Sequence, residues 1–167
     1  MNRRFRFGTS VRLAAVLALA SAACAEDTTE TVDGGLGYAV EFPSKQAAIA
    51  SDSLKVYVFG SDQDCLTLIQ TRRGGGQLPV AIAETPAAPV CDYLSGAAGS
   101  NIELAQGDYV VLAVAQRENQ DFLLGCAKQT VSSTVTPQPV NLSLADETRG
   151  VPATTCNLLA DKCGGRC

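Results

Sequence analysis

The chain has 167 residues, with 13 lysine and arginine side chains, 17 aspartate and glutamate side chains, and no histidine or tryptophan. Without histidine, Ser-His-Asp catalysis, Cys-His catalysis and histidine-based zinc sites are excluded. The acidic balance also argues against a nucleic-acid partner, because phosphate groups repel an acidic surface.

The first 23 residues have the composition of a signal peptide. Residues 1–12 carry four arginines and no acidic side chain, and residues 13–23, LAAVLALASAA, are apolar or small. A positive segment followed by a short apolar core directs export and is then removed. The apolar run is about half of the ~20 residues needed to span a bilayer, so it predicts no permanent transmembrane helix. After residue 23 the chain holds nine basic and seventeen acidic side chains, a net charge of −8.

Cys24 lies where signal cleavage is expected. The stretch Ala20-Ser21-Ala22-Ala23-Cys24 resembles the lipobox of bacterial lipoproteins, in which cleavage leaves the cysteine N-terminal and diacylated. Ser21 replaces the usual leucine, and ordinary cleavage after Ala-x-Ala is the alternative. By the same resemblance, Ala25 instead of aspartate implies the outer membrane of a Gram-negative cell. The membrane is thus the expected partner, through a lipid anchor on Cys24; without the anchor, the protein is periplasmic or secreted.

The composition divides the mature chain into a linker, a domain and a tail. Residues 24–37, CAEDTTETVDGGLG, are acidic and rich in Thr and Gly, so they predict a flexible linker. Residues 38–150 suit one domain of ordinary size. Residues 151–167 predict a cysteine-rich tail packed on the same domain.

The domain is predicted to be mainly β. Its clearest strand is residues 108–116, DYVVLAVAQ, where Tyr109, Val111 and Ala113 share one face and Val110, Leu112 and Val114 the other. Because both faces are apolar, a central strand covered on both sides is expected. Residues 122–127 follow through the polar connection 117–120, as in a hairpin. The other strand candidates are residues 38–42, 54–59, 130–136 and 140–144. We therefore expect a two-sheet sandwich with one short inserted helix and a disulfide-stapled tail.

The inserted helix is predicted after Ser61. Ser61 as N-cap with Asp64 three residues later resembles a capping box, and Arg72 and Arg73 suit a helix C-terminus before Gly74. Cys65 would lie on the buried face beside Ile69, so its disulfide should join this helix to the sheet or to a neighbouring loop.

The step from Gln106 to Val111 places a glycine before an aromatic-led strand. Together with residues 102–104, this step resembles the Gly-x-Tyr hairpin of prealbumin-like and carboxypeptidase-regulatory-like sandwiches. The resemblance covers about 15 residues and implies a sandwich fold, which hosts many unrelated functions.

Six cysteines follow Cys24, an even number that can close as three disulfides. C-x-x-C is absent, so zinc and thioredoxin-like redox sites are disfavoured. Fifteen pairings are possible for six cysteines. We expect Cys65 to pair with Cys91, and two further bridges among the remaining four. The six residues are Cys65, Cys91, Cys126, Cys156, Cys163 and Cys167.

No catalytic constellation, metal site or cofactor is predicted. Asp62 and Asp64 are expected to cap the helix, and Glu118 and Asp121 to be solvated in a turn. These observations predict a non-enzymatic lipoprotein of the cell envelope that acts as a structural or protein-binding module. The alternative is a soluble secreted binder, either of a small ligand or of a protease through the Gly164-Gly165-Arg166 loop.

Overall fold

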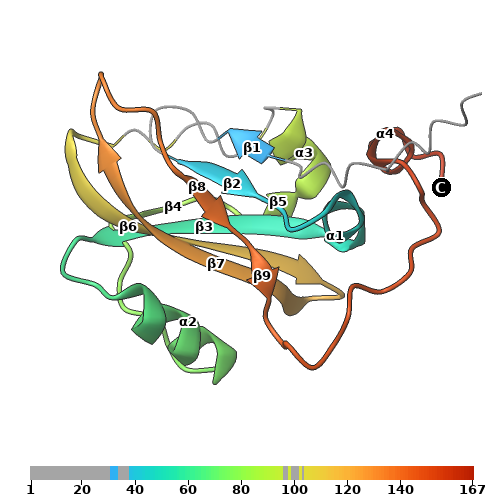
Figure 1. Cartoon of the computed structure of the whole chain (residues 1–167), viewed down its shortest axis with the longest axis horizontal. Coiled ribbons are helices and arrows are strands. Elements are labelled where there is room, and N and C mark those ends of the chain that lie inside the picture. The colour runs from blue at the N-terminus through green and yellow to red at the C-terminus, as the bar shows by residue number, and fades with distance from the viewer. Residues whose placement is uncertain (1–30, 34–37, 96–97, 99–101, 103) are drawn as a thin grey trace, which may run out of the picture.

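The computed structural model describes residues 31–33, 38–95, 98, 102 and 104–167. The predicted signal peptide, Cys24 and most of the predicted linker lie outside these residues. Three residues of that linker, Thr31–Asp33, form strand β1 and pair antiparallel with β2 (Ala39–Glu41). The described chain is mainly β and forms two sheets, as the residue patterns predicted (Figure 1).

The larger sheet is built around the strand that was predicted to be central. Strand β6 (Gly107–Arg117) pairs with β3 (Ser53–Gly60) on one side and β7 (Gln120–Val131) on the other, both antiparallel. Short strands complete its edges. Strands β4 (Ala83–Glu84) and β5 (Ala88–Pro89) both pair with β3, and β9 (Ser143–Leu144) pairs with β7.

The two faces of β6 face two different apolar clusters. Val111 and Ala113 pack in the cluster between the two sheets, with Tyr38, Val40 and other side chains of the small sheet. Val110, Leu112 and Val114 pack in a second cluster with Leu68 of the helix on the opposite face. Since each buried aliphatic side chain contributes about 1.5–3 kcal/mol, β6 alone carries much of the burial that holds the three layers together.

The β6–β7 connection is a tight hairpin turn. Glu118 and Asn119 have φ angles of 53° and 61°, and two positive φ values in a two-residue loop match the twist of antiparallel strands. The predicted strand 130–136 does not exist as a separate element. Strand β7 instead continues to Val131, and Ser132 and Val135 form an isolated bridge beyond it.

The predicted strand 140–144 divides between the two sheets. Strand β8 (Pro139–Asn141) pairs parallel with β2 and completes the small sheet, and β9 belongs to the large one. The chain changes sheets over Gly125 of β7, where an added Cβ would lie 2.4 Å from the carbonyl oxygen of Asn141. Gly125 therefore permits the close approach by which one segment joins both sheets.

The predicted helix is α2 (Cys65–Arg73), and it lies on the face of the large sheet opposite the small sheet (Figure 1). Its N-cap is Asp64, whose side chain accepts a hydrogen bond from the Thr67 amide at 2.9 Å, so the prediction of Ser61 as N-cap was wrong. Residues 60–63 instead form a turn, in which the Gln63 amide donates to the Gly60 carbonyl oxygen at 3.1 Å. Arg72 and Arg73 do lie in the last helical turn, before Gly74.

The sequence predicted one helix, and the described residues form three more. They are α1 (Lys45–Ala50), α3 (Val90–Leu94) and α4 (Leu159–Cys163). Each spans five or six residues, too few for a 3.6-residue period to emerge from the sequence. Ser44 caps α1 by accepting from the Ala47 amide at 3.1 Å.

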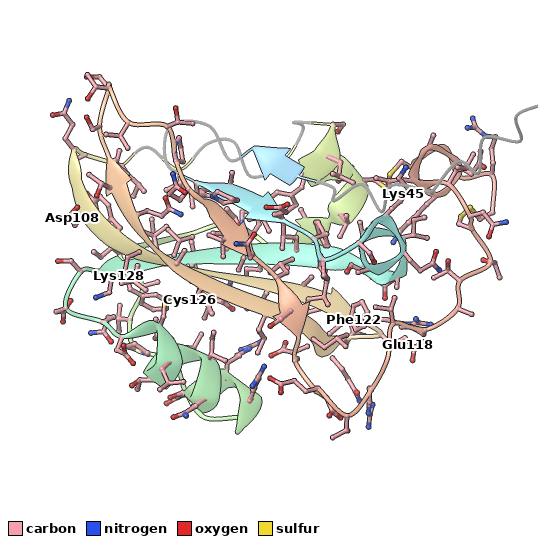
Figure 2. The ribbon with its side chains drawn as sticks, viewed as in Figure 1. Lys45, Asp108, Glu118, Phe122, Cys126 and Lys128 are labelled. Atoms are coloured by element: carbon pink, nitrogen blue, oxygen red, sulfur yellow. A yellow bond between two sulfur atoms is a disulfide. The ribbon has the colours of Figure 1, made fainter. Side chains whose placement is uncertain are left out.

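All six cysteines after Cys24 form disulfides, as expected, but the expected Cys65–Cys91 bridge was wrong. Cys65 of α2 pairs with Cys126 of β7, which Figure 2 labels, so this bridge does join the helix to the sheet. Cys91 of α3 pairs with Cys163 of α4, and Cys156 pairs with Cys167. The physical reason is that α2 packs on β7 and β6, whereas α3 contacts β1, β3 and β5.

Residue 103 of the predicted hairpin lies outside the described residues, and the described residues before Gly107 form no hairpin with β6. Ile102 and Leu104 lie outside strands, and β6 pairs with β3 and β7 instead. Tyr109 donates its hydroxyl proton to the carbonyl oxygen of Ala105 at 3.0 Å, which fixes the entry into β6.

Candidate functional site

The acidic residues selected from the sequence do not form a catalytic or metal-binding group. No cluster of three or more histidine, cysteine, aspartate or glutamate side chains occurs within the described residues. Asp62 is exposed and accepts from the side chain of its neighbour Gln63. Asp64 caps α2, and the hydrogen bonds from Thr67, first its amide and then its hydroxyl, lower the pKa of Asp64. Capping thus accounts for Asp64, as predicted, whereas the predicted capping role of Asp62 was wrong.

Asp121 is part of a polar network, which corrects its prediction as a solvated turn residue. Its two carboxylate oxygens accept from Arg72, with Nε–Oδ2 and Nη2–Oδ1 distances of 2.6 and 3.0 Å, and Gln116 donates to Oδ1 at 3.1 Å. Only about a fifth of the Asp121 side chain is exposed (21%). Because Arg72 belongs to the last turn of α2, this two-pronged ion pair fixes to β7 the end of the helix opposite the Cys65–Cys126 disulfide.

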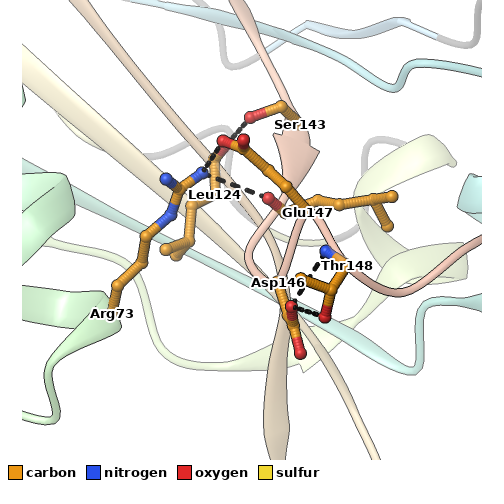
Figure 3. Close-up of polar contacts among 7 residues, drawn as sticks. Arg73, Leu124, Ser143, Asp146, Glu147 and Thr148 are labelled. Atoms are coloured by element: carbon orange, nitrogen blue, oxygen red, sulfur yellow. Dashed lines mark hydrogen bonds and ion pairs between the residues drawn. The ribbon is translucent and has the colours of Figure 1, made fainter.

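Arg73 makes a looser contact from the same helix turn. Its Nη2 donates to Glu147 Oε1 at 3.0 Å, as Figure 3 shows. The same nitrogen donates to the Leu144 carbonyl oxygen at 3.2 Å. In the same loop, the hydroxyl and amide of Thr148 both donate to Asp146, and these bonds lower the pKa of its carboxyl. Both arginines before Gly74 are therefore structural contacts in this fold.

Two cavities lie on either side of the β6–β7 turn. One, of about 300 Å³, is lined by Arg117, Phe122, Leu144 and Arg149 among others. The other, of about 340 Å³, is lined by Arg117, Asp52, Lys162, Thr154 and the Cys156–Cys167 disulfide among others. Arg117 and Glu118 belong to both linings, and Figure 2 places Glu118 at the tip of the hairpin. The polar side chains of the hairpin turn therefore separate the two cavities.

The Arg117 guanidinium is only partly satisfied. Its Nε lies 3.5 Å from Glu118 Oε1, whereas Nη1 is fully buried and has no hydrogen-bond partner among the described residues. The ladder register shifts between Ala115 and Gln116, just before this arginine, and such bulges re-aim the side chains that follow. Asp52 Oδ2 accepts from the Glu118 amide at 2.7 Å and fixes the turn from the start of β3.

Lys162 of α4 reaches the same cavity. Its amine donates to the carbonyl oxygens of Ile49, at 2.7 Å, and of Ser51, two groups at the C-terminal end of α1. Burial lowers the pKa of Lys162; the charge of Asp52 opposes part of this change and that of Arg117 adds to it. Sequence reasoning missed Lys162 and Arg117 as a pair, because 45 positions separate them and no local pattern links them.

A second surface feature is an extended apolar segment, residues 77–82. Val80 is 96% exposed, the highest value among the exposed large apolar side chains. Ile82 is 61% exposed, close to Leu66 at 63%. Leu78 and Ala81 pack against the cluster under α2 and hold the segment in place. Residues 74–83 contain no charged side chain. Within the described residues, the single backbone hydrogen bond of this segment joins the Ile82 amide to the Val58 carbonyl.

Comparisons with protein-family models, with curated proteins and with solved structures find no match to this chain. The chemistry of the described side chains therefore carries the functional argument. Among these residues, none of the helices is long and apolar enough to cross a bilayer. The segment presents unpaired backbone and apolar surface, and the cavities present charged side chains.

Proposed function

We propose that this protein is exported, anchored in the cell envelope by a lipid on Cys24, and acts there as a non-enzymatic protein-binding module. The observation that carries the proposal is the pairing of the six later cysteines in three disulfides, which leaves no other cysteine of the seven with which Cys24 could pair. Stable disulfides belong to oxidising compartments, and an odd thiol in an exported protein calls for a separate role.

The extended segment 77–82 supports a protein partner. An exposed, uncharged chain with unpaired N–H and C=O groups offers the main-chain hydrogen bonds that extended-peptide recognition uses. The segment is also preorganised: α2 before it is bridged to β7 by Cys65–Cys126, and β4 after it pairs with β3. A rigid segment loses little conformational entropy when it binds. Pro79 has no N–H, so a partner cleft that contacts individual side chains suits it better than a continuous partner strand.

Acylation of Cys24 is the first expected result. Protein extracted from native membranes should have an intact mass that begins at Cys24 and includes acyl groups, and Cys24→Ala should lose both the added mass and the membrane fraction. Six alkylatable thiols should appear only after reduction. An unlipidated protein whose mass begins before Cys24 or at Ala25 would contradict the anchor. Thiols that are free before reduction would contradict the disulfides.

The binding surface is tested separately at Val80. A photo-crosslinking residue at position 80 should form an adduct with an envelope protein in intact cells. The same residue at Val135, a valine that is 48% exposed at the β7–β8 connection, should not. Excess unlabelled protein should suppress the adduct, whereas the Val80→Asp variant should not. Because Val80 is almost fully exposed, this substitution should change the free energy of unfolding by less than about 0.5 kcal/mol. Equal adducts from both positions would refute the assignment.

The alternative role as a protease inhibitor is weakened at its proposed site. The Arg166 Nε donates to Asp161 Oδ1 at 3.0 Å, and its Nη2 donates to the Ala160 carbonyl at 3.2 Å. The guanidinium thus folds back onto α4, whereas a protease-binding arginine should project into the cleft of the enzyme.

A further inference from the structure

The cavity beside Lys162 brings together three distant parts of the chain. Arg117 comes from the end of β6, Asp52 from the start of β3, and Lys162, Thr154 and the Cys156–Cys167 disulfide from the tail. Its volume of about 340 Å³ lies at the small end of the usual range for ligand pockets, about 300–1,000 Å³. Ile49 and Ala50 supply an apolar part of the lining. The cavity therefore suits a small molecule or the end of a chain.

The hydrogen-bonding capacity of its two cations is not used up. Arg117 Nη1 is buried without a partner among the described residues, and a buried charged donor without an acceptor is costly. The Lys162 ammonium has three donors, of which two meet the Ile49 and Ser51 carbonyls. Asp52 uses one carboxylate oxygen on the Glu118 amide, and Glu118 is 80% exposed, so neither fully compensates Arg117.

The charges of the lining restrict the class of ligand. The two cationic side chains of the lining, Arg117 and Lys162, are balanced by the carboxylates of Asp52 and Glu118. A single negative charge can pair with the guanidinium, whereas a dianion would be repelled about twice as strongly by the same two carboxylates. A carboxylate is planar and matches the two N–H groups of a guanidinium edge.

We propose that this cavity binds the carboxylate group of a small organic monoanion, with Arg117 as its charged anchor and Lys162 as the second cation. The proposal is independent of the lipid anchor and of segment 77–82.

The test is an NMR titration of the disulfide-bonded protein with propionate and with propionamide, its neutral analogue. Propionate should cause saturable shifts at Arg117 and Thr154, and propionamide should not. Arg117→Gln should weaken propionate binding by about tenfold or more, since a hydrogen bond to a charged group is lost. Arg149→Gln removes the same charge from an exposed arginine (76%) that lines only the other cavity, and its binding should stay within about twofold.

Each other outcome has a defined meaning. Equal binding of propionamide, unchanged binding in Arg117→Gln, or tighter binding of inorganic phosphate would overturn the monoanion assignment. Loss of binding in Arg149→Gln would also overturn it, because the other cavity would then hold the ligand. If Arg117→Gln fails to fold, Arg117→Lys takes its place, because lysine retains the charge without the planar donor pair. The proposal then requires that Arg117→Lys bind propionate more weakly than the unaltered protein does. A comparison of N-acetyl-alanine with its C-terminal amide then distinguishes a peptide terminus from a free acid. If N-acetyl-alanine binds more tightly than propionate and its amide does not bind, the ligand is a chain terminus.

Discussion

Replacing Cys65 and Cys126 together by alanine should lower the free energy of unfolding by about 4 kcal/mol. The bridge closes a loop across a sequence separation of 61 residues, and in the chain-entropy description the loss grows with the logarithm of loop length. It also releases α2 from the sheet, where Arg72–Asp121 is the remaining two-pronged contact. Urea unfolding monitored by circular dichroism measures the change.

The matched control is the Cys156→Ala, Cys167→Ala double variant. Its bridge spans a separation of only 11, so its loss should cost about 3 kcal/mol, less than that of the longer loop. The difference tests the pairing as well as the energetics. If the tail variant were the less stable of the two, the large-loop assignment of Cys65 to Cys126 would be refuted.

Gly125→Ala should be the most damaging single substitution that adds only a methyl group. The new Cβ would lie 2.4 Å from the Asn141 oxygen and 2.9 Å from its carbonyl carbon, and both are backbone atoms that cannot rotate away. Overpacking of this kind costs on the order of 3 kcal/mol. The displaced segment is the point at which the chain passes from β8 to β9, so both sheets should loosen together.

Gly150→Ala serves as the control for this substitution. A Cβ at Gly150 meets no atom within 4 Å, so the stability should change by less than about 0.5 kcal/mol. The urea midpoints of both variants, measured with an unchanged m-value, make the comparison. A Gly125→Ala midpoint equal to that of Gly150→Ala would mean that the two sheets do not meet at this glycine.

The strand pattern was predictable where neighbouring residues carried it. Alternation predicted β3, and the doubly apolar run from Val110 to Val114 predicted a buried central strand whose two faces are now seen against different clusters. The helix from Cys65 to Arg73 was predictable from its flanking charges, although its N-cap was misplaced because Ser61 and Asp64 both precede it with capping side chains. The short helices left no periodic trace.

The candidate sites were much less predictable. Exposure of Val80 depends on Leu78 and Ala81 packing inward, which no count of apolar residues reveals. In the sequence Asp121 resembles any turn carboxylate, because its partner Arg72 lies 49 positions away in the chain. The same holds for Arg117, because residues distant in the chain bury its Nη1 and its sequence neighbours do not reveal this.

The sequence by itself determined the even set of six cysteines, the mainly β fold and the absence of histidine chemistry, because composition and short-range periodicity suffice for these. Only the tertiary structure decided which cysteines pair, how residues 139–144 divide between two sheets, and that Arg117 and Lys162 share a cavity. These features arise from contacts between residues far apart in the chain. Such contacts are selected by the packing of whole layers, and a local pattern contains no information about them.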